Sequence, residues 1–385
     1  MKLNAYPQTP PYTWEKVDPI FNAPYTLSTH LFPACYLRTT RPVPVPEPPS
    51  PNASKEERRR ILKATELALT ALRGSTVTDG HPWCYGLDER NRTGITLFFA
   101  HANGFPKEIW EPTLAHLLSS PIANIIDEVW LWESIQHGDA ALVNAPAASG
   151  LFDSASNAKL PTHLSRVPQT ESDLRSKQGF SNRKLVVVGH SYGGCTSTLA
   201  ASFFPALFHT LILIDPVVVE PYDDTKGKSN SFVGGALSRR ETWSSREEAL
   251  QSFQSNPFFT AWDPAVLKIY VECGLHTSTS GSPIARLKMP GVQEAAVFSE
   301  IHTEIEAFGR LSRLDERIAL RWIMPGKPGA RSIGLPETVP RRVWVRPANS
   351  SNTRILGGGH LIPQEAPREL AEDLNEYLLE RLANL

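Results

Sequence analysis

The chain has 385 residues, of which 41% are hydrophobic and 21% are charged, and its formal net charge is −1. A chain of this length can bury a large core, either as one α/β domain or as a domain with an inserted cap. The balanced charge provides no basic surface for nucleic acid, and no apolar run approaches the roughly 20 residues needed to span a bilayer. We therefore expect a globular protein with neither a nucleic-acid partner nor an integral membrane segment.

The N-terminus and the cysteines favour an intracellular compartment. The opening run MKLNAYPQTPPYTWEK lacks the apolar core of a secretory signal peptide. The cysteines lie far apart and form no C-x-x-C pair, so we expect reduced thiols rather than a disulfide framework or a zinc site. They are Cys35, Cys84, Cys195 and Cys273.

Proline dominates the first part of the chain, where 12 of the 33 prolines lie within the first 51 residues. The densest cluster, RPVPVPEPPSP at residues 41–51, favours extended polyproline geometry and cannot continue a helix or a central strand. Ser54 and Glu57 then form the S-x-x-E pattern of a capping box, which predicts the start of a helix but not its end. We interpret residues 1–94 as N-terminal strands and a proline-rich insertion packed on the core.

From residue 95 onward, short β-rich runs alternate with helix-compatible stretches, which is typical of parallel β-α-β units. The fold class is therefore α/β, with a mostly parallel central sheet flanked by helices, and residues 95–216 and 300–385 form the predicted core. The predicted strands are 95–100, 129–133, 185–189, 210–215 and 342–346, and the predicted helices are 107–118 and 367–382.

Between residues 217 and 299 the strand pattern disappears. This segment contains a polar loop, TKGKSNS, two helix-like stretches, REEALQSF and PAVLKIYVECG, and a Gly/Ser-rich run, TSTSGSP. An insertion between two late strands is where a lid over an active site would lie. We predict a helical cap at residues 217–299.

The run LVVVGHSYGG, at residues 185–194, is the most informative part of the chain. An apolar strand leads into G-x-S-x-G and a helix-compatible stretch follows, which is the context of a nucleophile elbow. The serine of such a turn projects above the sheet, and the flanking glycines allow the strand and the helix to approach closely. Ser191 is therefore the predicted nucleophile.

A serine nucleophile needs a base and, in most cases, an acid that orients the base. His360, in LGGGHLIP, lies on a glycine-rich loop before the terminal helix and is the predicted base. The acid often follows the penultimate strand, but residues 341–360 contain no Asp or Glu. The alternative position is the end of the preceding strand, LILIDP, where Asp215 becomes the predicted acid. A pair without an acid stays open, and the reserve acids are Asp224, Asp263 and Glu304.

The other histidines are interpreted as structural residues or as pointing away from the serine. His190 precedes the nucleophile, and the turn should direct its ring away from Ser191. The remaining histidines considered are His101, His137, His209 and His302.

The negative oxygen that develops during acyl transfer needs two backbone N–H donors. One donor is expected from Tyr192, the residue after the nucleophile. The other is expected from the loop HANGF, where we favour the Asn103 amide, with Gly104 next. Such a site needs no metal ion and no organic cofactor.

Together these motifs resemble the α/β-hydrolase superfamily from about residue 95 to the C-terminus. A closer likeness lies in AHANGFPKEIWEP, QHGDAALVN, LFHTLILIDPVVVEP and FFTAWDP. These segments are similar to fungal α/β-hydrolases that include a yeast peroxisomal lipase and hydrolases of host-selective toxin pathways. The proline-rich region 41–91 departs from that pattern by looking expanded. The resemblance implies a reaction class and not a substrate.

Members of that fungal group commonly carry peroxisomal signals at the C-terminus. The last residues, Ala383, Asn384 and Leu385, keep the small first residue and the final leucine of the S-K-L signal, with asparagine in the middle position. We expect a peroxisomal import receptor as a partner. The alternative is an ordinary helix end and a cytoplasmic location.

The resulting hypothesis is a serine hydrolase that cleaves an ester, thioester or lactone with a hydrophobic acyl part, a small-molecule substrate. One alternative is an acyltransferase or cyclase of secondary metabolism that uses the same serine and an acceptor other than water. Another is a catalytically silent ligand-binding homologue, because a fold alone does not decide function. A haloalkane dehalogenase is disfavoured, since its nucleophile would be an aspartate at the position of Ser191.

Overall fold

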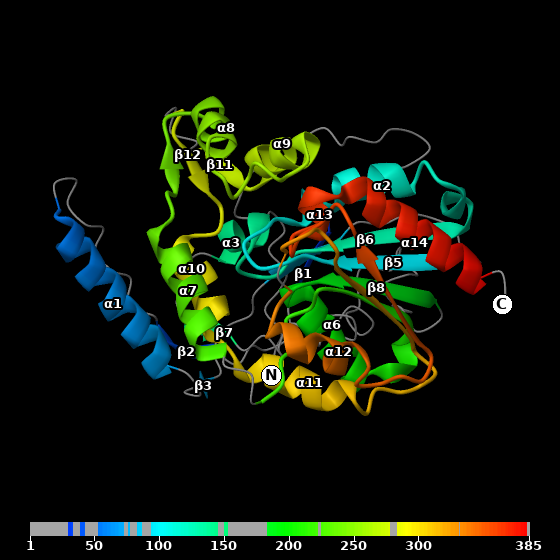
Figure 1. The fold of residues 1–385 in the computed structure, drawn as a ribbon. Coiled ribbons are helices and arrows are strands. Elements are labelled where there is room, and N and C mark those ends of the chain that lie inside the picture. The colour runs from blue at the N-terminus through cyan, green and yellow to red at the C-terminus, as the bar shows by residue number, and fades with distance from the viewer. Residues whose placement is uncertain are drawn as a thin grey trace, which may run out of the picture.

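The computed structural model of the chain describes residues 30–33, 39–42, 53–72, 76–77, 83–86, 94–144, 150–152, 183–221, 225–277, 283–330 and 332–382. At its centre lies a sheet of six parallel strands in the order β14-β13-β9-β8-β5-β6 (Figure 1). The predicted parallel α/β sheet is confirmed. Its strands are β5 (Ile95–Ala100), β6 (Ile126–Trp132), β8 (Lys184–His190), β9 (Phe208–Ile214), β13 (Ala319–Pro325) and β14 (Ser350–Ile355).

Both faces of the central sheet are covered, and alternate side chains serve the two faces. In β9, Leu211 and Leu213 enter one core cluster, whereas Ile212 and Ile214 enter the other. A strand buried on both faces is apolar throughout rather than alternating. That composition is why β5, β8 and β9 could be predicted from the sequence.

Helices α6, α11 and α12 cover one face of the sheet, and α2 and α14 cover the other (Figure 1). The predicted helix 367–382 is α14, and the predicted helix 107–118 is a 3₁₀ turn followed by α2. In the described ranges no helix is long and apolar enough to cross a bilayer. The bounds are η1 (Lys107–Trp110), α2 (Glu111–Leu117), η2 (Pro121–Ile125), α3 (Gly138–Asn144), α6 (Tyr192–Phe203), η4 (Pro205–Leu207), α11 (His302–Leu311), η5 (Pro336–Thr338), α12 (Val339–Val343), α13 (Ile362–Glu365) and α14 (Pro367–Leu382).

One edge of the sheet differs from the prediction. The strand predicted at residues 342–346 is wrong, because helix α12 begins at Val339, with Pro340 in its first turn, and ends at Val343, and a turn follows it. The missed strands are β13 and β14. β14 is the outermost strand and is partly exposed, so its sequence SSNTRI has no apolar signal. In β13 the apolar run is interrupted by Arg321, which pairs with Asp373 of α14.

Residues 217–299 contain helices and also a small antiparallel sheet in the order β10-β12-β11. The helices predicted in REEALQSF and PAVLKIYVECG are confirmed, but TKGKSNS begins a helix rather than forming a loop. The strands have two or three residues, which is too short to produce a sequence pattern. The bounds are α7 (Thr225–Ser238), β10 (Thr242–Trp243), α8 (Arg246–Gln254), α9 (Pro264–Cys273), β11 (Leu275–Thr277), β12 (Ala285–Leu287) and α10 (Gly291–Ser299).

Helix α7 is stabilised by packing rather than by its glycine-containing sequence. Its Val233 and Ala236 are buried against Ala295 and Ala296 of α10. On the other side of this segment, α9 contacts η1 and α2 of the core. Residues 217–299 therefore lie over the loop that follows β5.

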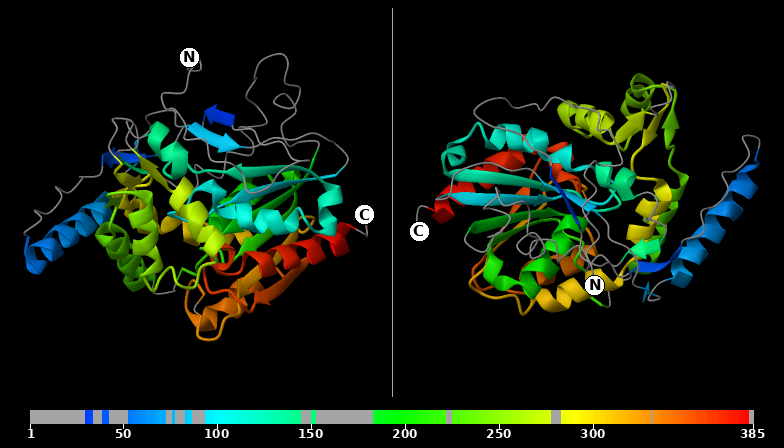
Figure 2. Two further views of the ribbon diagram at one scale, coloured as in Figure 1. Left: turned by 90° about the horizontal axis from the view of Figure 1, so that it is seen from above. Right: turned by 180° about the vertical axis from the view of Figure 1, so that it is seen from behind.

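The described part of residues 1–94 includes helix α1 (Lys55–Leu72). The Glu57 N–H donates to Ser54 Oγ at 3.1 Å, so the predicted helix start is confirmed. Helix α1 packs against α7 and α10, with Leu69 buried, and lies on their outer side in both figures (Figures 1 and 2). Short antiparallel strands complete this part: β1 (His30–Pro33) with β4 (Trp83–Gly86), and β2 (Thr39–Pro42) with β3 (Thr76–Val77) and β7 (Gly150–Phe152). Most of the proline cluster 41–51 lies outside the described residues.

Candidate active site

Strand β8 and helix α6 meet at Ser191 in a strained turn. The φ of Ser191 is 53° and its ψ is −115°, a region that residues with a side chain seldom adopt. The Ser191 N–H donates to the Ile214 carbonyl at 3.0 Å, and the Ser191 carbonyl accepts from the N–H groups of Cys195 and Val217 at 3.1 and 3.0 Å. The predicted elbow is therefore present, with its serine between a strand end and a helix N-terminus.

Glycines beside the serine allow α6 to touch the sheet. A Cβ on Gly193 would lie 2.2 Å from the Ala100 carbonyl oxygen, and a Cβ on Gly194 would lie 2.7 Å from the Pro216 Cβ. Side chains never approach backbone this closely, so any larger residue would push the helix away from β5 and β9. The glycines thus fix the height at which Ser191 stands above the sheet.

His360 lies between Ser191 and Asp215. Its Nε2 is 3.1 Å from Ser191 Oγ, and its Nδ1 is 2.7 Å from Asp215 Oδ2. Asp215 follows β9, Ser191 follows β8 and His360 follows β14, so all three lie at the carboxyl edge of one parallel sheet. The Asp215 side chain is fully buried, whereas the imidazole is 26% exposed. The structure brings together the three residues predicted from separate parts of the sequence.

Asp215 reaches the histidine, but the loop after the penultimate strand lies earlier in the chain than expected. Because β13 ends at Pro325, this loop is 326–349 rather than part of 341–360, and it contains Glu337. The side chain of Glu337 is exposed. Two other residues of this loop donate hydrogen bonds to Asp215. The Ser332 hydroxyl donates to Oδ1 and the Ile333 N–H donates to Oδ2.

Two of the reserve acids lie among the described residues. Asp263 caps α9 by accepting the Ala265 N–H at 2.8 Å. Glu304 lies on α11, and its carbonyl accepts from Val219. Asp224 lies outside the described residues.

His190 points away from Ser191 Oγ but is not remote from the site. Its Nε2–H donates to the His360 carbonyl oxygen at 2.8 Å, and the two imidazole rings lie 5.3 Å apart. Burial, reinforced by the proximity of His360, holds the pKa of His190 well below its usual value. A neutral His190 therefore anchors the backbone of His360 across the whole neutral pH range.

The loop that carries Asn103 lies beside the start of α6. A Cβ on Gly193 would also lie 2.6 Å from the His101 carbonyl oxygen, so the first turn of the helix contacts this loop. Asn103 is 7% exposed, and among the described residues no acceptor receives its backbone N–H. The predicted donors Asn103 and Tyr192 thus belong to neighbouring backbone segments. Gly104, the alternative, has φ +90° and lies beneath the Glu294 carboxylate.

The Asn103 side chain is held by residues that the sequence analysis treated as structural or did not consider. His137 Nε2–H donates to Asn103 Oδ1 at 3.0 Å, and Asn103 Nδ2 donates to the Glu294 carbonyl at 3.1 Å. The His137 ring stacks on Tyr192 with 5.8 Å between ring centroids. Burial keeps the pKa of His137 well below its usual value, so the ring stays neutral. His137 belongs to the motif QHGDAALVN, which is similar to segments of the fungal hydrolases, but the motif alone does not indicate what His137 contacts.

His101 is buried and hydrogen-bonded to backbone groups. Its Nδ1–H donates to the Ala102 carbonyl at 2.8 Å and its Nε2 accepts the Ser134 N–H at 3.1 Å, which fixes one tautomer. Burial lowers its pKa to about 4. His209 and His302 have no contact with the three residues of the site: His209 bonds to Thr210, and the His302 N–H bonds to Glu300.

A buried charged cluster lies directly after the HANGF loop. Lys107 Nζ lies 2.6 Å from Glu108, 3.2 Å from Asp139 and 3.4 Å from Glu133, and Lys288 Nζ lies 2.6 Å from Asp139. Glu133 also accepts the backbone N–H of Lys107 at 3.1 Å. The cluster therefore ties the loop after β5 to the end of β6, to α3 and to residues 217–299.

Two carboxyls of this cluster have pKa values displaced in opposite directions. Burial raises the pKa of Glu133 to about 7, and Lys107 acts against it. Burial also opposes ionisation of Asp139, but Lys107 and Lys288 together outweigh it and lower its pKa to about 2.

Asp139→Asn is expected to lower the free energy of unfolding at pH 7 by about 3–5 kcal/mol, because two buried lysines lose their shared partner. The folded pKa of about 2 lies below the unfolded value of 3.8, so the part of the stabilisation that depends on ionisation of Asp139, about 2–3 kcal/mol, is present above pH 4 and is lost as the pH falls toward 2. Urea unfolding measures both effects. Glu306→Gln, which breaks an exposed pair with Arg310, is the control and should change stability by less than about 1 kcal/mol. Equal losses in the two variants at pH 7 would contradict the assignment.

Comparison with known proteins agrees with the α/β fold. A family model described as the alpha/beta hydrolase family matches residues 97–373. The peroxisomal membrane protein LPX1 of Saccharomyces cerevisiae is 24% identical over 308 residues, which is 76% of each chain. The type I acyl-CoA thioesterase mpaH of Penicillium brevicompactum is 28% identical over 233 residues, 59% of this chain and 46% of that protein. The chain thus matches less than half the length of the Penicillium relative.

A solved structure shares the fold over nearly the whole chain. The peroxisomal α/β-hydrolase Lpx1 from Saccharomyces cerevisiae aligns with a TM-score of 0.65 at 22% identity, over 94% of this chain and 91% of that one. The family match spans well over half of the 385 residues, and it includes the parallel sheet, the elbow and the loop of His360. The chain belongs to the alpha/beta hydrolase family.

Proposed function

We propose that this protein is a serine hydrolase that cleaves an ester, thioester or lactone with a hydrophobic acyl part through an acyl-enzyme. The observation that carries the proposal is the position of His360, with Nε2 at 3.1 Å from Ser191 Oγ and Nδ1 at 2.7 Å from Asp215. A hydroxyl, an imidazole and a buried carboxylate in this order form the arrangement that activates a serine.

In the proposed reaction, His360 Nε2 takes the Ser191 proton as Oγ attacks the carbonyl carbon, and then gives it to the leaving alcohol or thiol. Asp215 accepts the Nδ1–H throughout, which fixes the tautomer and stabilises the imidazolium. Water then attacks the acyl-enzyme with the help of the same base, which releases the carboxylic acid and regenerates Ser191.

The oxyanion formed in each step is assigned to the backbone N–H groups of Asn103 and Tyr192. Tyr192 is the first residue of α6, so the positive end of the helix dipole also points at the developing charge. The chain from His137 through Asn103 to Glu294 supports this assignment, because it holds the Asn103 residue in one orientation.

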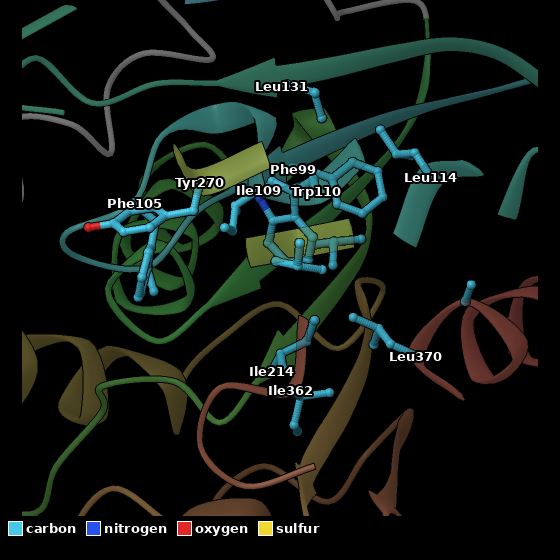
Figure 3. Packing of buried hydrophobic residues seen from close by; sticks show 14 of the residues in the cluster. Phe99, Phe105, Ile109, Trp110, Leu114, Leu131, Ile214, Tyr270, Ile362 and Leu370 are labelled. Carbon is cyan, nitrogen blue, oxygen red and sulfur yellow. The ribbon is translucent and has the colours of Figure 1, made fainter. Parts of the chain in front are cut away.

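We assign the preference for a hydrophobic acyl part to residues 217–299, as a cap on a core formed by 95–216 and 300–385. Phe105, next to the proposed oxyanion donors, packs edge-on against Trp262 and Tyr270 of this segment, with ring centroids 5.5 and 5.9 Å apart. Figure 3 shows Phe105 and Tyr270 side by side at one end of a buried apolar cluster. Aromatic walls of this kind suit an apolar chain.

An acyl-chain panel tests both the reaction and the cap. The relative described as an acyl-CoA thioesterase makes thioesters the first choice, so esters and acyl-CoA thioesters from acetyl to palmitoyl are compared. We expect kcat/KM for octanoyl to exceed that for acetyl by at least about tenfold, since each buried methylene contributes about 0.8 kcal/mol. Trp262→Ala should reduce this ratio, whereas Phe232→Ala, 47% exposed in the same segment, should leave it unchanged.

Other outcomes of the panel decide against the proposal. Turnover that requires an alcohol or amine acceptor and does not occur with water would make the protein an acyltransferase or cyclase. Tight ligand binding without turnover of any substrate would make it a silent binding protein. If Trp262→Ala leaves the ratio of kcat/KM for octanoyl and acetyl substrates unchanged, residues 217–299 do not set the acyl preference.

The peroxisome is proposed as the location, through residues 383–385, which lie outside the described residues. The name of the yeast relative, a peroxisomal membrane protein, supports this proposal. A fluorescent protein fused to the N-terminus should give puncta that coincide with a peroxisomal marker and disappear when Ala-Asn-Leu is deleted. A fusion ending in Ser-Lys-Leu is the positive control. The same diffuse signal with and without the native tripeptide would refute import by this route.

A further inference from the structure

The buried guanidinium of Arg342 lies next to the residues that hold Asp215. Arg342 is 0% exposed, although arginine is seldom fully buried. It comes from α12, the helix that occupies the position of a predicted strand. A buried cation in that place is costly unless nearby groups compensate it.

Arg342 joins the two loops on either side of the carboxylate. Its Nη1 donates to the Val218 carbonyl at 2.9 Å, in the loop that follows β9 and Asp215. Its Nη2 donates to Ser332 Oγ at 3.2 Å and to the Ile333 carbonyl, in the loop that follows β13. The same Ser332 hydroxyl and the Ile333 N–H donate to the two oxygens of Asp215. Arg342 therefore holds both donors of the carboxylate in place.

The hydrogen bonds from Arg342 through Ser332 to Asp215, called the relay below, all point the same way, from donor to acceptor. Ser332 Oγ accepts from the guanidinium and donates its proton to Asp215, so the positive charge strengthens the bond that the hydroxyl makes. Asp215 itself has φ +32°, a conformation that its surroundings must maintain. Its backbone N–H bonds to the Ile323 carbonyl at 2.9 Å, at the end of β13. The position of Asp215 thus depends on contacts with β13 and the loop after it, although Asp215 itself follows β9.

We propose that Arg342 is a positioning residue for the proposed reaction, acting through Ser332 and Ile333 to set the orientation and the field of Asp215 toward His360. This inference rests on the proposed function, and its failure can be measured separately. Arg342 does not touch Ser191 or His360; it works through the carboxylate.

The positive charge of Arg342 should affect protonation of the His360 imidazole in one direction. A nearby cation disfavours the imidazolium, so removal of the cation should move the titration of His360 to higher pH. Among the described residues, other charged or titratable groups around Arg342 and His360 include His190, Asp215 and the Lys327–Glu365 pair beside the His360 loop. Glu220 also belongs to them, because its carboxylate interacts with Arg342 as well as with Arg341. Arg341, the preceding residue, pairs with Glu220 at the surface and is 62% exposed. It provides a matched control.

The experiment compares Arg342→Gln, Arg342→Lys and Arg341→Gln. The first readout is the rate of Ser191 labelling by a fluorophosphonate as a function of pH. The second is the titration midpoint of the His360 imidazole by NMR of histidine-labelled protein, with the resonance assigned by its absence in His360→Gln. Arg342→Gln should label about 10- to 100-fold more slowly at pH 7, the size of one charge-assisted hydrogen bond. Its midpoint should lie measurably above that of wild type.

The variants separate charge from geometry and from folding. Arg342→Lys should restore the midpoint but only part of the rate, because an ammonium cannot reproduce the two-pronged contact. Arg341→Gln should match wild type in both readouts. If Arg342→Gln does not fold, Ser332→Ala takes its place, with Ser332→Thr as the variant that restores the donor. Slow labelling by Ser332→Ala and its rescue by Ser332→Thr would then support the relay.

Two results would overturn the inference. One is a folded Arg342→Gln with wild-type labelling and a wild-type midpoint. The other is slow labelling at every pH with no movement of the midpoint, which is the signature of a merely structural loss. If wild type does not label at Ser191 at all, the proposed function fails, and the His360 midpoint still decides whether Arg342 acts on the Asp215–His360 pair.

Discussion

Ser191→Ala is expected to retain the fold and to lose almost all turnover of the acyl substrates. Loss of the serine nucleophile costs about 10⁶-fold in kcat in serine proteases, and a comparable loss is expected here if the acyl-enzyme is obligatory. KM should change little, because the Oγ contributes more to the transition state than to substrate binding.

Ser202→Ala is the control for this variant. Ser202 lies on the same helix and its hydroxyl bonds to the Leu199 carbonyl at 2.8 Å, at the end of α6 away from the turn. Activity of Ser202→Ala should stay near wild type. A Ser191→Ala protein that keeps more than a few per cent of wild-type kcat on the same substrate would show that another group performs the attack.

Asp215→Asn is expected to be the second most damaging change, with a loss of about 10⁴-fold in kcat, as for the corresponding substitution in a serine protease. The carboxylate accepts the His360 Nδ1–H at 2.7 Å. An amide can present its NH₂ group to that nitrogen and so favour the wrong tautomer. The protein should still fold, because Asn has the size of Asp and its single amide oxygen can still accept from Ser332, although the Ile333 N–H then loses its acceptor.

Asp263→Asn tests the alternative acid directly. Asp263 caps α9, and Asn is also a favourable cap, so this variant should keep both stability and activity. Activity of Asp215→Asn within a few-fold of wild type, together with a folded but inactive Asp263→Asn, would transfer the role to Asp263.

The strongest local signals in the sequence were the ones that predicted the structure well. The elbow was recognisable because strand, serine, glycines and helix are consecutive. Gly189 and Gly193 are each required by a backbone atom at less than 3 Å from the absent Cβ. β9 was recognisable because burial on both faces makes it continuously apolar. Asp215 then followed from its place at the end of that strand.

The edge of the sheet could not be predicted by the same signal. β14 is half exposed and polar, and the VWV run that looked like a strand is largely the end of helix α12 and the turn after it. A strand at 342–346 would put the loop of the acid after residue 346, whereas the loop that follows β13 is 326–349 and contains Glu337. A strand at 342–346 also gives no reason to expect that Arg342 contacts Ser332 and Ile333, in the loop that follows β13.

The residues that hold the Asn103 loop in place could not be predicted from the sequence, because their contacts join distant segments of the chain. His137 and Glu294 are 157 positions apart, from 137 to 294, and meet only through Asn103. Lys107 and Lys288 share Asp139 in the same manner. No local pattern encodes such pairs, since each depends on how residues 217–299 pack on the core.

The central claim is that Ser191, activated by His360 and Asp215, forms the covalent intermediate. The most direct measurement is peptide mapping by mass spectrometry after treatment with a fluorophosphonate. We expect one adduct per chain, on Ser191, which is absent in Ser191→Ala and strongly slowed in His360→Ala. A folded wild-type protein that carries no adduct, or that carries it on another residue, would show that Ser191 is not the nucleophile.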